Sequence, residues 1–142
     1  MKHLIAAIIL LSLISCSEGS ESGASNDESS VFASDIFGAW VVLEDATQCE
    51  NRYVFSSDNT FTLNSLDESI VGTYRFLMSS NSTTLFDLLL EVTSDNGLTD
   101  CDGGALDNTG SNYAYIVEFI EENKMTWTQI LPNPFSVTLV KQ

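Results

Sequence analysis

The chain has 142 residues, of which 20 are Asp or Glu and 5 are Lys or Arg, so its formal net charge is −15 at pH 7. Binding to nucleic acid or to anionic lipid head groups needs clustered Lys and Arg, and this composition argues against both. We therefore expect no nucleic acid among the partners, whereas a cationic partner is compatible with the charge.

A short apolar run opens the chain at residues 4–14 and follows the basic residue Lys2. It falls short of the roughly 20 residues that span a bilayer as a helix. A charged start, a short apolar core and a small residue after it are typical of a secretory signal. Residues 1–15 are therefore predicted to be a signal peptide that is removed on export.

The end of this segment, Leu13-Ile14-Ser15-Cys16, resembles the lipobox of bacterial lipoproteins. The resemblance implies cleavage before Cys16 and attachment of acyl chains such as palmitate, with the lipid bilayer as partner. Burial contributes about 0.8 kcal/mol per methylene, so two or three long chains anchor a protein firmly. The location implied is the cell membrane, and the outer membrane in a diderm bacterium because Ser17 follows Cys16. The alternative is an ordinary cleaved signal that contains a cysteine.

Residues 17–34 consist mostly of Ser, Glu, Gly, Asn and Asp. Such a segment cannot bury enough apolar surface to order itself. As a flexible chain it reaches about 23 Å, at 5–6 Å times the square root of its length. We expect residues 16–34 to be a lipidated cysteine followed by an acidic tether, and residues 35–142 to form one domain.

Short apolar runs rich in aromatic and β-branched residues follow, separated by polar turns. They predict about eight strands, at residues 40–43, 52–55, 60–63, 70–77, 84–92, 113–120, 125–131 and 135–140. Successive strands joined by short turns pair with their neighbours as an antiparallel meander. Closing that meander into an up-and-down barrel removes its two exposed edges. The expected fold is thus an all-β, eight-stranded barrel, with a two-sheet sandwich as the competing topology.

The three cysteines are Cys16, Cys49 and Cys101. If Cys16 carries lipid, an even pair remains in an oxidising compartment, where pairing is the default. Cys49 falls in the first predicted loop and Cys101 in the fifth. Alternate loops of a meander lie at the same end of the barrel, so a Cys49–Cys101 disulfide is geometrically allowed and is expected.

Three short motifs suggest a family. Gly38-Ala39-Trp40 resembles the Gly-x-Trp signature before the first strand of lipocalin and lipocalin-like barrels. Asp58-Asn59-Thr60-Phe61 and Gly72-Thr73-Tyr74 are similar to repeated patterns of small bacterial lipocalin-like domains. The resemblance covers residues 36–141 and implies that Trp40 plugs the closed end of a barrel. The alternative for Trp40 is a core aromatic of the first strand.

The available side chains favour a protein that is not an enzyme. The only histidine is His3, inside the predicted signal, so the mature chain lacks a Ser-His-Asp or Cys-His system and His-ligated zinc or haem. No cofactor is expected. Four acidic residues in the loop of residues 93–112 are weak calcium candidates, because they lack the spacing of an EF-hand and its closing Glu: Asp95, Asp100, Asp102 and Asp107.

Two functions remain open for an exported barrel. One is the binding of a small apolar ligand at the disulfide-bearing end, lined by four aromatic candidates: Trp40, Tyr74, Tyr115 and Trp127. The other is a filled barrel that acts through another envelope protein. Barrels of eight strands are either filled by side chains or hold one small ligand. A void below about 300 Å³ at that end would argue against ligand capture, since ligand pockets are usually larger.

Overall fold

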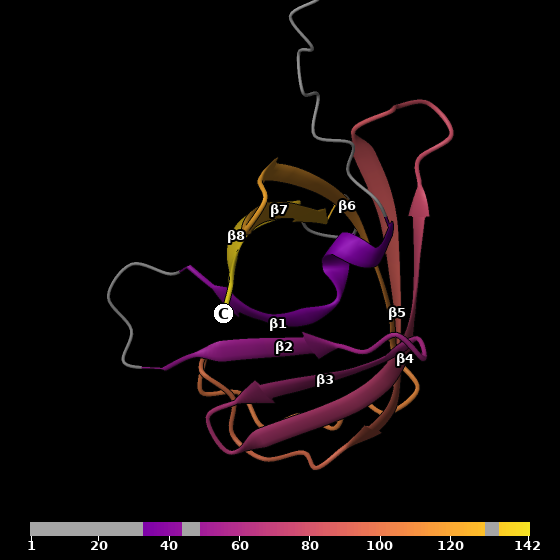
Figure 1. Ribbon diagram of the computed structural model, residues 1–142. Helices are drawn as coiled ribbons and strands as arrows, with labels where there is room; N and C mark the ends of the chain where they lie inside the picture. The colour runs from indigo at the N-terminus through magenta and orange to yellow at the C-terminus, as the bar shows by residue number, and fades with distance from the viewer. Residues whose placement is uncertain (1–32, 44–48, 130–133) are drawn as a thin grey trace, which may run out of the picture.

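The computed structural model of the chain describes residues 33–43, 49–129 and 134–142. The predicted signal peptide, Cys16 and the predicted tether up to residue 32 lie outside the described residues. The elements are one 3-10 helix and eight strands (Figure 1): η1 Ala33–Ile36, β1 Gly38–Val42, β2 Asn51–Phe55, β3 Thr60–Ser65, β4 Glu68–Met78, β5 Leu85–Asp95, β6 Asn112–Glu121, β7 Lys124–Gln129 and β8 Phe135–Lys141. None of the helices described is long and apolar enough to cross a membrane.

The strands form a closed antiparallel barrel in which each strand pairs with the next one along the chain. Closure is made by β1, which pairs with β2 on one side and with β8 on the other. Trp40 of β1, for example, lies opposite Tyr53 of β2 and Lys141 of β8. The predicted up-and-down barrel is therefore confirmed, and the sandwich is excluded.

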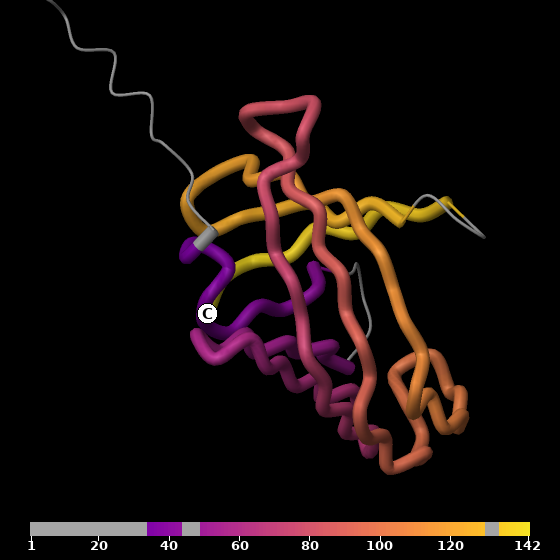
Figure 2. Tube along the Cα trace, turned by 90° about the vertical axis from the view of Figure 1, so that its right-hand side faces the viewer, coloured from indigo at the N-terminus to yellow at the C-terminus, as the bar shows by residue number. Residues whose placement is uncertain are grey.

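The eight strands occur where the apolar runs predict them, but most of them are longer than predicted. β4 begins at Glu68 instead of residue 70, and β5 continues to Asp95 instead of residue 92. Figure 2 shows the β4–β5 hairpin projecting at one end of the barrel, with the β5–β6 loop at the other end. The last two residues of the predicted seventh strand, 130 and 131, lie outside the described residues.

Strand β4 shows how the inner face is made. Its side chains are buried at every second residue from Glu68 to Phe76, as expected for a strand with one face in the core. Gly72 lies at a register shift between β4 and β5. A Cβ atom there would overlap the carbonyl oxygen of Glu91 and the ring of Phe61, so only glycine fits this close approach.

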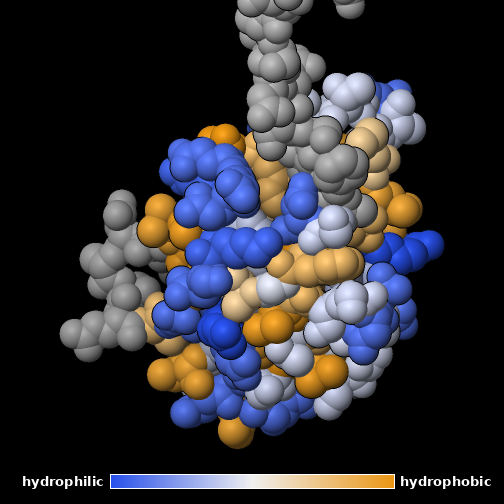
Figure 3. Space-filling view, in the orientation of Figure 1, coloured by the Kyte–Doolittle hydropathy of each residue, from blue (hydrophilic) through white to orange (hydrophobic). Residues whose placement is uncertain are grey.

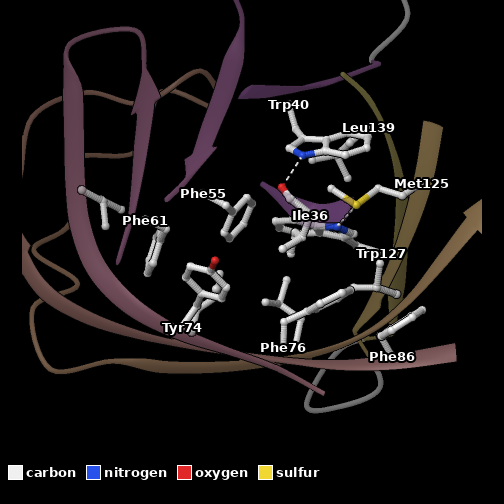
Figure 4. Packing of buried hydrophobic residues seen from close by; sticks show 14 of the residues in the cluster. Ile36, Trp40, Phe55, Phe61, Tyr74, Phe76, Phe86, Met125, Trp127 and Leu139 are labelled. Carbon is white, nitrogen blue, oxygen red and sulfur yellow. Dashed lines mark hydrogen bonds between the residues drawn. The ribbon is translucent and has the colours of Figure 1, made fainter. Parts of the chain in front are cut away.

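The barrel end that carries η1 is filled by side chains (Figure 4). Trp40 is fully buried, and its indole Nε1 donates a hydrogen bond to the carbonyl oxygen of Ile36 at 2.7 Å. The ammonium group of Lys141 lies 5.2 Å from the centre of the Trp40 ring and donates to the carbonyl oxygen of Asp35. Beside Trp40, three rings pack against one another: Phe76, Phe86 and Phe119.

Candidate binding site at the disulfide-bearing end

The disulfide joins the chain before β2 to the long β5–β6 loop. Cys49 and Cys101 are bonded at an S–S distance of 2.01 Å, with their Cα atoms 5.5 Å apart. The predicted pairing is confirmed, and both cysteines lie at the barrel end opposite η1. Closing a loop with a sequence separation of 52 contributes about 4 kcal/mol on the chain-entropy account. The bridge therefore ties the β5–β6 loop to the segment before β2.

Within the β5–β6 loop, carboxylates bind backbone N–H groups. Asp95 accepts hydrogen bonds from the backbone N–H of Gly97 and from both the backbone and side-chain nitrogens of Asn108. These bonds outweigh the effect of burial and lower the pKa of Asp95. Asp100 accepts from the backbone N–H groups of Asp102 and Gly104. This loop is therefore held in one conformation by its own acids.

The predicted calcium candidates also form hydrogen bonds within the loop. Asp107 accepts a hydrogen bond from the backbone N–H of Thr109, whose side chain and backbone lower the pKa of Asp107. Asp102 is exposed, while Asp95 and Asp100 act as acceptors for the loop. In the ranges that the structure describes, no group of three or more acidic, Cys or His side chains could hold a metal ion. We therefore infer no metal site from these four aspartates.

The β5–β6 loop is also attached to the turn between β3 and β4. The carbonyl oxygen of Thr99 accepts from the backbone N–H groups of Asp67 and Glu68, at 3.0 and 3.1 Å. The Nδ2 of Asn96 donates to the carbonyl oxygen of Asp67. The backbone N–H of Cys101 donates to the hydroxyl of Ser65, a fully buried side chain. Loop and turn thus form one rigid rim.

A cavity of about 270 Å³ opens below this rim. Its apolar lining comes from Phe61, Leu63, Ile70, Leu90, Val92 and Leu106. Its polar lining comes from Glu68, Asp100, Asn108 and three tyrosines, Tyr53, Tyr113 and Tyr115. The volume lies below the limit of about 300 Å³ for ligand pockets. By that limit, the cavity does not support capture of a free apolar ligand.

Glu68 is the unusual member of the lining. The residue as a whole is only 6% exposed, and no hydrogen bond contributes to the pKa of its carboxylate. Among the described residues no buried side-chain oxygen or nitrogen lacks a partner, so the Glu68 oxygens are accessible from the cavity. Burial, and then the charges of Asp95 and Asp100, raise the pKa of Glu68. No basic group offsets these effects. The cavity therefore contains a partly desolvated acid whose carboxylate is accessible from the cavity.

Of the four aromatic residues predicted to line a ligand cavity, one does so. Tyr115 lines the cavity, and burial raises its pKa to about 12. Tyr74 instead donates its hydroxyl to the carbonyl oxygen of Ser56, at the other end of the barrel. Trp40 and Trp127 are buried in the core, where the Trp127 Nε1 donates to the sulfur of Met125. Trp40, Tyr74 and Trp127 are not part of the lining of this cavity, and Tyr74 instead lines a smaller one of about 140 Å³.

Glu68 is the site residue that the sequence prediction missed. A signal for it exists, since Glu68 is two residues before Ile70 and shares the inward face with Ile70 and Tyr74. A strand predicted to begin at residue 70 leaves it in a turn, where an acid is unremarkable.

Comparison with known proteins gives no match: no family model fits the sequence, and no curated protein or solved structure is significantly similar to it. The fold and the cavity therefore have to carry the functional argument.

Proposed function

We propose that the protein is a membrane-anchored, non-enzymatic lipoprotein with a largely filled, lipocalin-like barrel that acts by binding another envelope protein. The observation that carries this proposal is the disulfide-bearing rim, where exposed leucines surround a cavity too small for a free ligand. Leu66, Leu98 and Leu106 have exposed fractions of 62%, 52% and 72%. They lie on the β3–β4 turn and the β5–β6 loop, which hydrogen bonds join into one rim.

The backbone at Leu66 supports a role for this rim. Leu66 has a φ of 55°, a left-handed conformation that costs a residue with a Cβ about 1–2 kcal/mol. Glycine or asparagine would fit the position without that cost. A strained and exposed leucine does not add to the free energy of unfolding, whereas it presents an apolar side chain to a partner.

The face of the barrel shown in Figure 3 gives less support for a contact site. On the face shown in Figure 3, hydrophobic residues lie in separate patches among hydrophilic ones. An interface core is usually a contiguous apolar area with a polar rim. We therefore place the contact at the disulfide-bearing end.

The proposed anchor is compatible with this placement. Cys16 is proposed to carry the acyl chains, and the described part of the chain enters the barrel through η1. That helix lies at the end opposite the disulfide, so the rim is the end of the barrel farther from the point of attachment. Mass spectrometry of the intact protein from membranes tests the anchor. The expected mass is that of residues 16–142 plus acyl chains, and an unmodified Cys16 would refute it.

Site-specific photo-crosslinking in intact cells tests the contact. A photoreactive amino acid replaces Leu106 at the rim or, as matched control, Leu77 on the outer face of β4 near the other end, which is 57% exposed. We expect a discrete adduct with one envelope protein from position 106 and none from position 77. Adducts at both positions, or at neither, would contradict a specific protein contact at the rim.

A further inference from the structure

We propose that the cavity below the rim receives a lysine side chain of the partner protein, whose ammonium group binds the carboxylate of Glu68. The inference rests on the proposed function and names the group that the partner inserts. It starts from one fact: Glu68, a residue that is more than nine-tenths buried, lines a cavity that opens at the surface and has no basic residue in its lining.

The shape of the cavity suits a single long side chain. Its volume of about 270 Å³ is below the range for drug-sized ligands. Its walls are apolar at Phe61, Leu90 and Leu106, which match the methylene stem of lysine. Rings of Tyr113 and Tyr115 are part of the same lining, and aromatic faces attract a nearby ammonium ion. Lysine thus complements both the apolar and the polar part of the lining.

Two carboxylates are part of the cavity lining, and lysine supplies three N–H donors for them. Asn108 already donates to Asp95 and accepts from the hydroxyl of Tyr113. Asp100 uses its Oδ1 for two backbone N–H groups, which leaves its Oδ2 as an acceptor. The carboxylate of Glu68 has both oxygens available. Two acidic acceptors in one small cavity call for a cation with several N–H donors.

Charge complementarity points the same way. The chain has a net charge of −15, and no basic residue is part of the cavity lining. Partial burial disfavours the charged form of Glu68, and a cation that pairs with the carboxylate offsets that cost on binding. The described acidic groups do not meet the requirement for a metal site. An organic cation on an apolar stem fits the cavity better than an inorganic ion.

The direct test uses a side-chain probe on the full-length protein in neutral detergent. Nα-acetyl-lysine methylamide is titrated while the carboxyl resonance of Glu68 is followed by ¹³C NMR. The matched probe is Nα-acetyl-norleucine methylamide, which has the same stem without the ammonium group. We expect a saturable shift with the lysine probe in the millimolar range and at least tenfold weaker binding of the norleucine probe. Equal binding of the two probes would overturn the proposal.

Glu68→Gln removes the charge at nearly constant shape, and Glu91→Gln on the exposed face of β5 is the matched control. We expect at least a tenfold loss of lysine-probe affinity in E68Q and less than a twofold change in E91Q. Unchanged affinity in E68Q would overturn the assignment. The titration of the unmodified protein remains a valid test even if E68Q were to fold poorly.

The cellular experiment separates this inference from the function on which it rests. In E68Q the adduct from position 106 should fall several-fold. An adduct that persists unchanged would overturn the lysine contact and leave the protein interface standing. Absence of the adduct in the otherwise unmodified chain would remove the proposed function itself. Binding of n-butylammonium through Glu68, with an adduct indifferent to E68Q, would assign the cavity to a free amine and also overturn the lysine proposal.

Discussion

Ser65 and Cys101, 36 residues apart in the sequence, are joined by a hydrogen bond from the backbone N–H of Cys101 to the hydroxyl oxygen of Ser65 at 2.9 Å. The Ser65 side chain is 2% exposed, and the bond is partly shielded from water. It ties the disulfide-bearing loop to the end of β3 beside the cavity. The geometry of the rim therefore depends on one buried hydroxyl as well as on the disulfide.

Replacement of Ser65 by alanine should weaken the rim without opening the barrel. The backbone N–H of Cys101 would lose its partner, which costs about 1–3 kcal/mol for a buried group. We expect a lower free energy of unfolding in urea and faster hydrogen exchange of the Cys101 amide. Ser94→Ala, at an exposed position of β5, is the control and should leave both values unchanged. An unaltered exchange rate in S65A would mean that the Ser65 hydroxyl does not hold the loop.

Gly72 gives a second prediction, on packing. A methyl group there would meet backbone and ring atoms of Glu91 and Phe61, and neither can withdraw easily. We expect Gly72→Ala to lower the free energy of unfolding by about 3 kcal/mol, the upper part of the usual range for overpacking. Gly103→Ala is a useful contrast because nothing lies within 4 Å of the added atom.

At Gly103 only the left-handed backbone, with a φ of 80°, opposes a side chain. Its replacement by alanine should therefore cost about 1–2 kcal/mol. Thermal unfolding of both variants gives the comparison. Equal losses would show that the register shift at Gly72 relaxes to admit a methyl group.

The sequence was sufficient to predict the strands, their order and the disulfide. The strands follow from the local pattern of apolar and polar residues, and the disulfide follows from both cysteines lying in odd-numbered loops of the meander. Alternating burial places a strand, and the odd loops of a meander share one end whatever the side chains do. The residues that line the cavity were harder to predict from the sequence. Trp40 and Trp127 were selected because they are large and apolar, but their depth in the barrel is set by strand stagger and by which neighbours fill the space. Glu68 was missed because strand ends are the least certain feature of a pattern.

Tyr115 leads to a prediction at alkaline pH. Burial raises its pKa from 10.0 to about 12 in the folded protein. A raised folded pKa means that the neutral phenol stabilises the fold below pH 10 and that this contribution is lost as the pH rises to about 12. Two pKa units correspond to about 3 kcal/mol. We expect the free energy of unfolding to fall across this interval.

Tyr115→Phe is the control for that experiment, since it keeps the ring and cannot ionise. Its stability should fall less between pH 10 and about 12 than that of the unmodified protein. Urea denaturation followed by tryptophan fluorescence measures both. Parallel curves for the two proteins would show that Tyr115 ionises in the folded state as easily as in the unfolded one.

Glu68 leads to a prediction of the same sign at acidic to neutral pH. Its pKa is raised by burial and by Asp95 and Asp100, so the folded protein keeps this proton to higher pH than the unfolded chain does. The associated stability is therefore present below the ordinary value of 4.5 and is lost as the pH rises through the raised pKa. Glu68→Gln does not titrate, and it should match the unmodified protein at about pH 4 and be more stable at about pH 7. Urea unfolding at both pH values measures the difference, with E91Q as the exposed-charge control. A gap between E68Q and the unmodified protein that stays constant with pH would show that the Glu68 carboxylate is already solvated, and it would remove the need for a cationic partner.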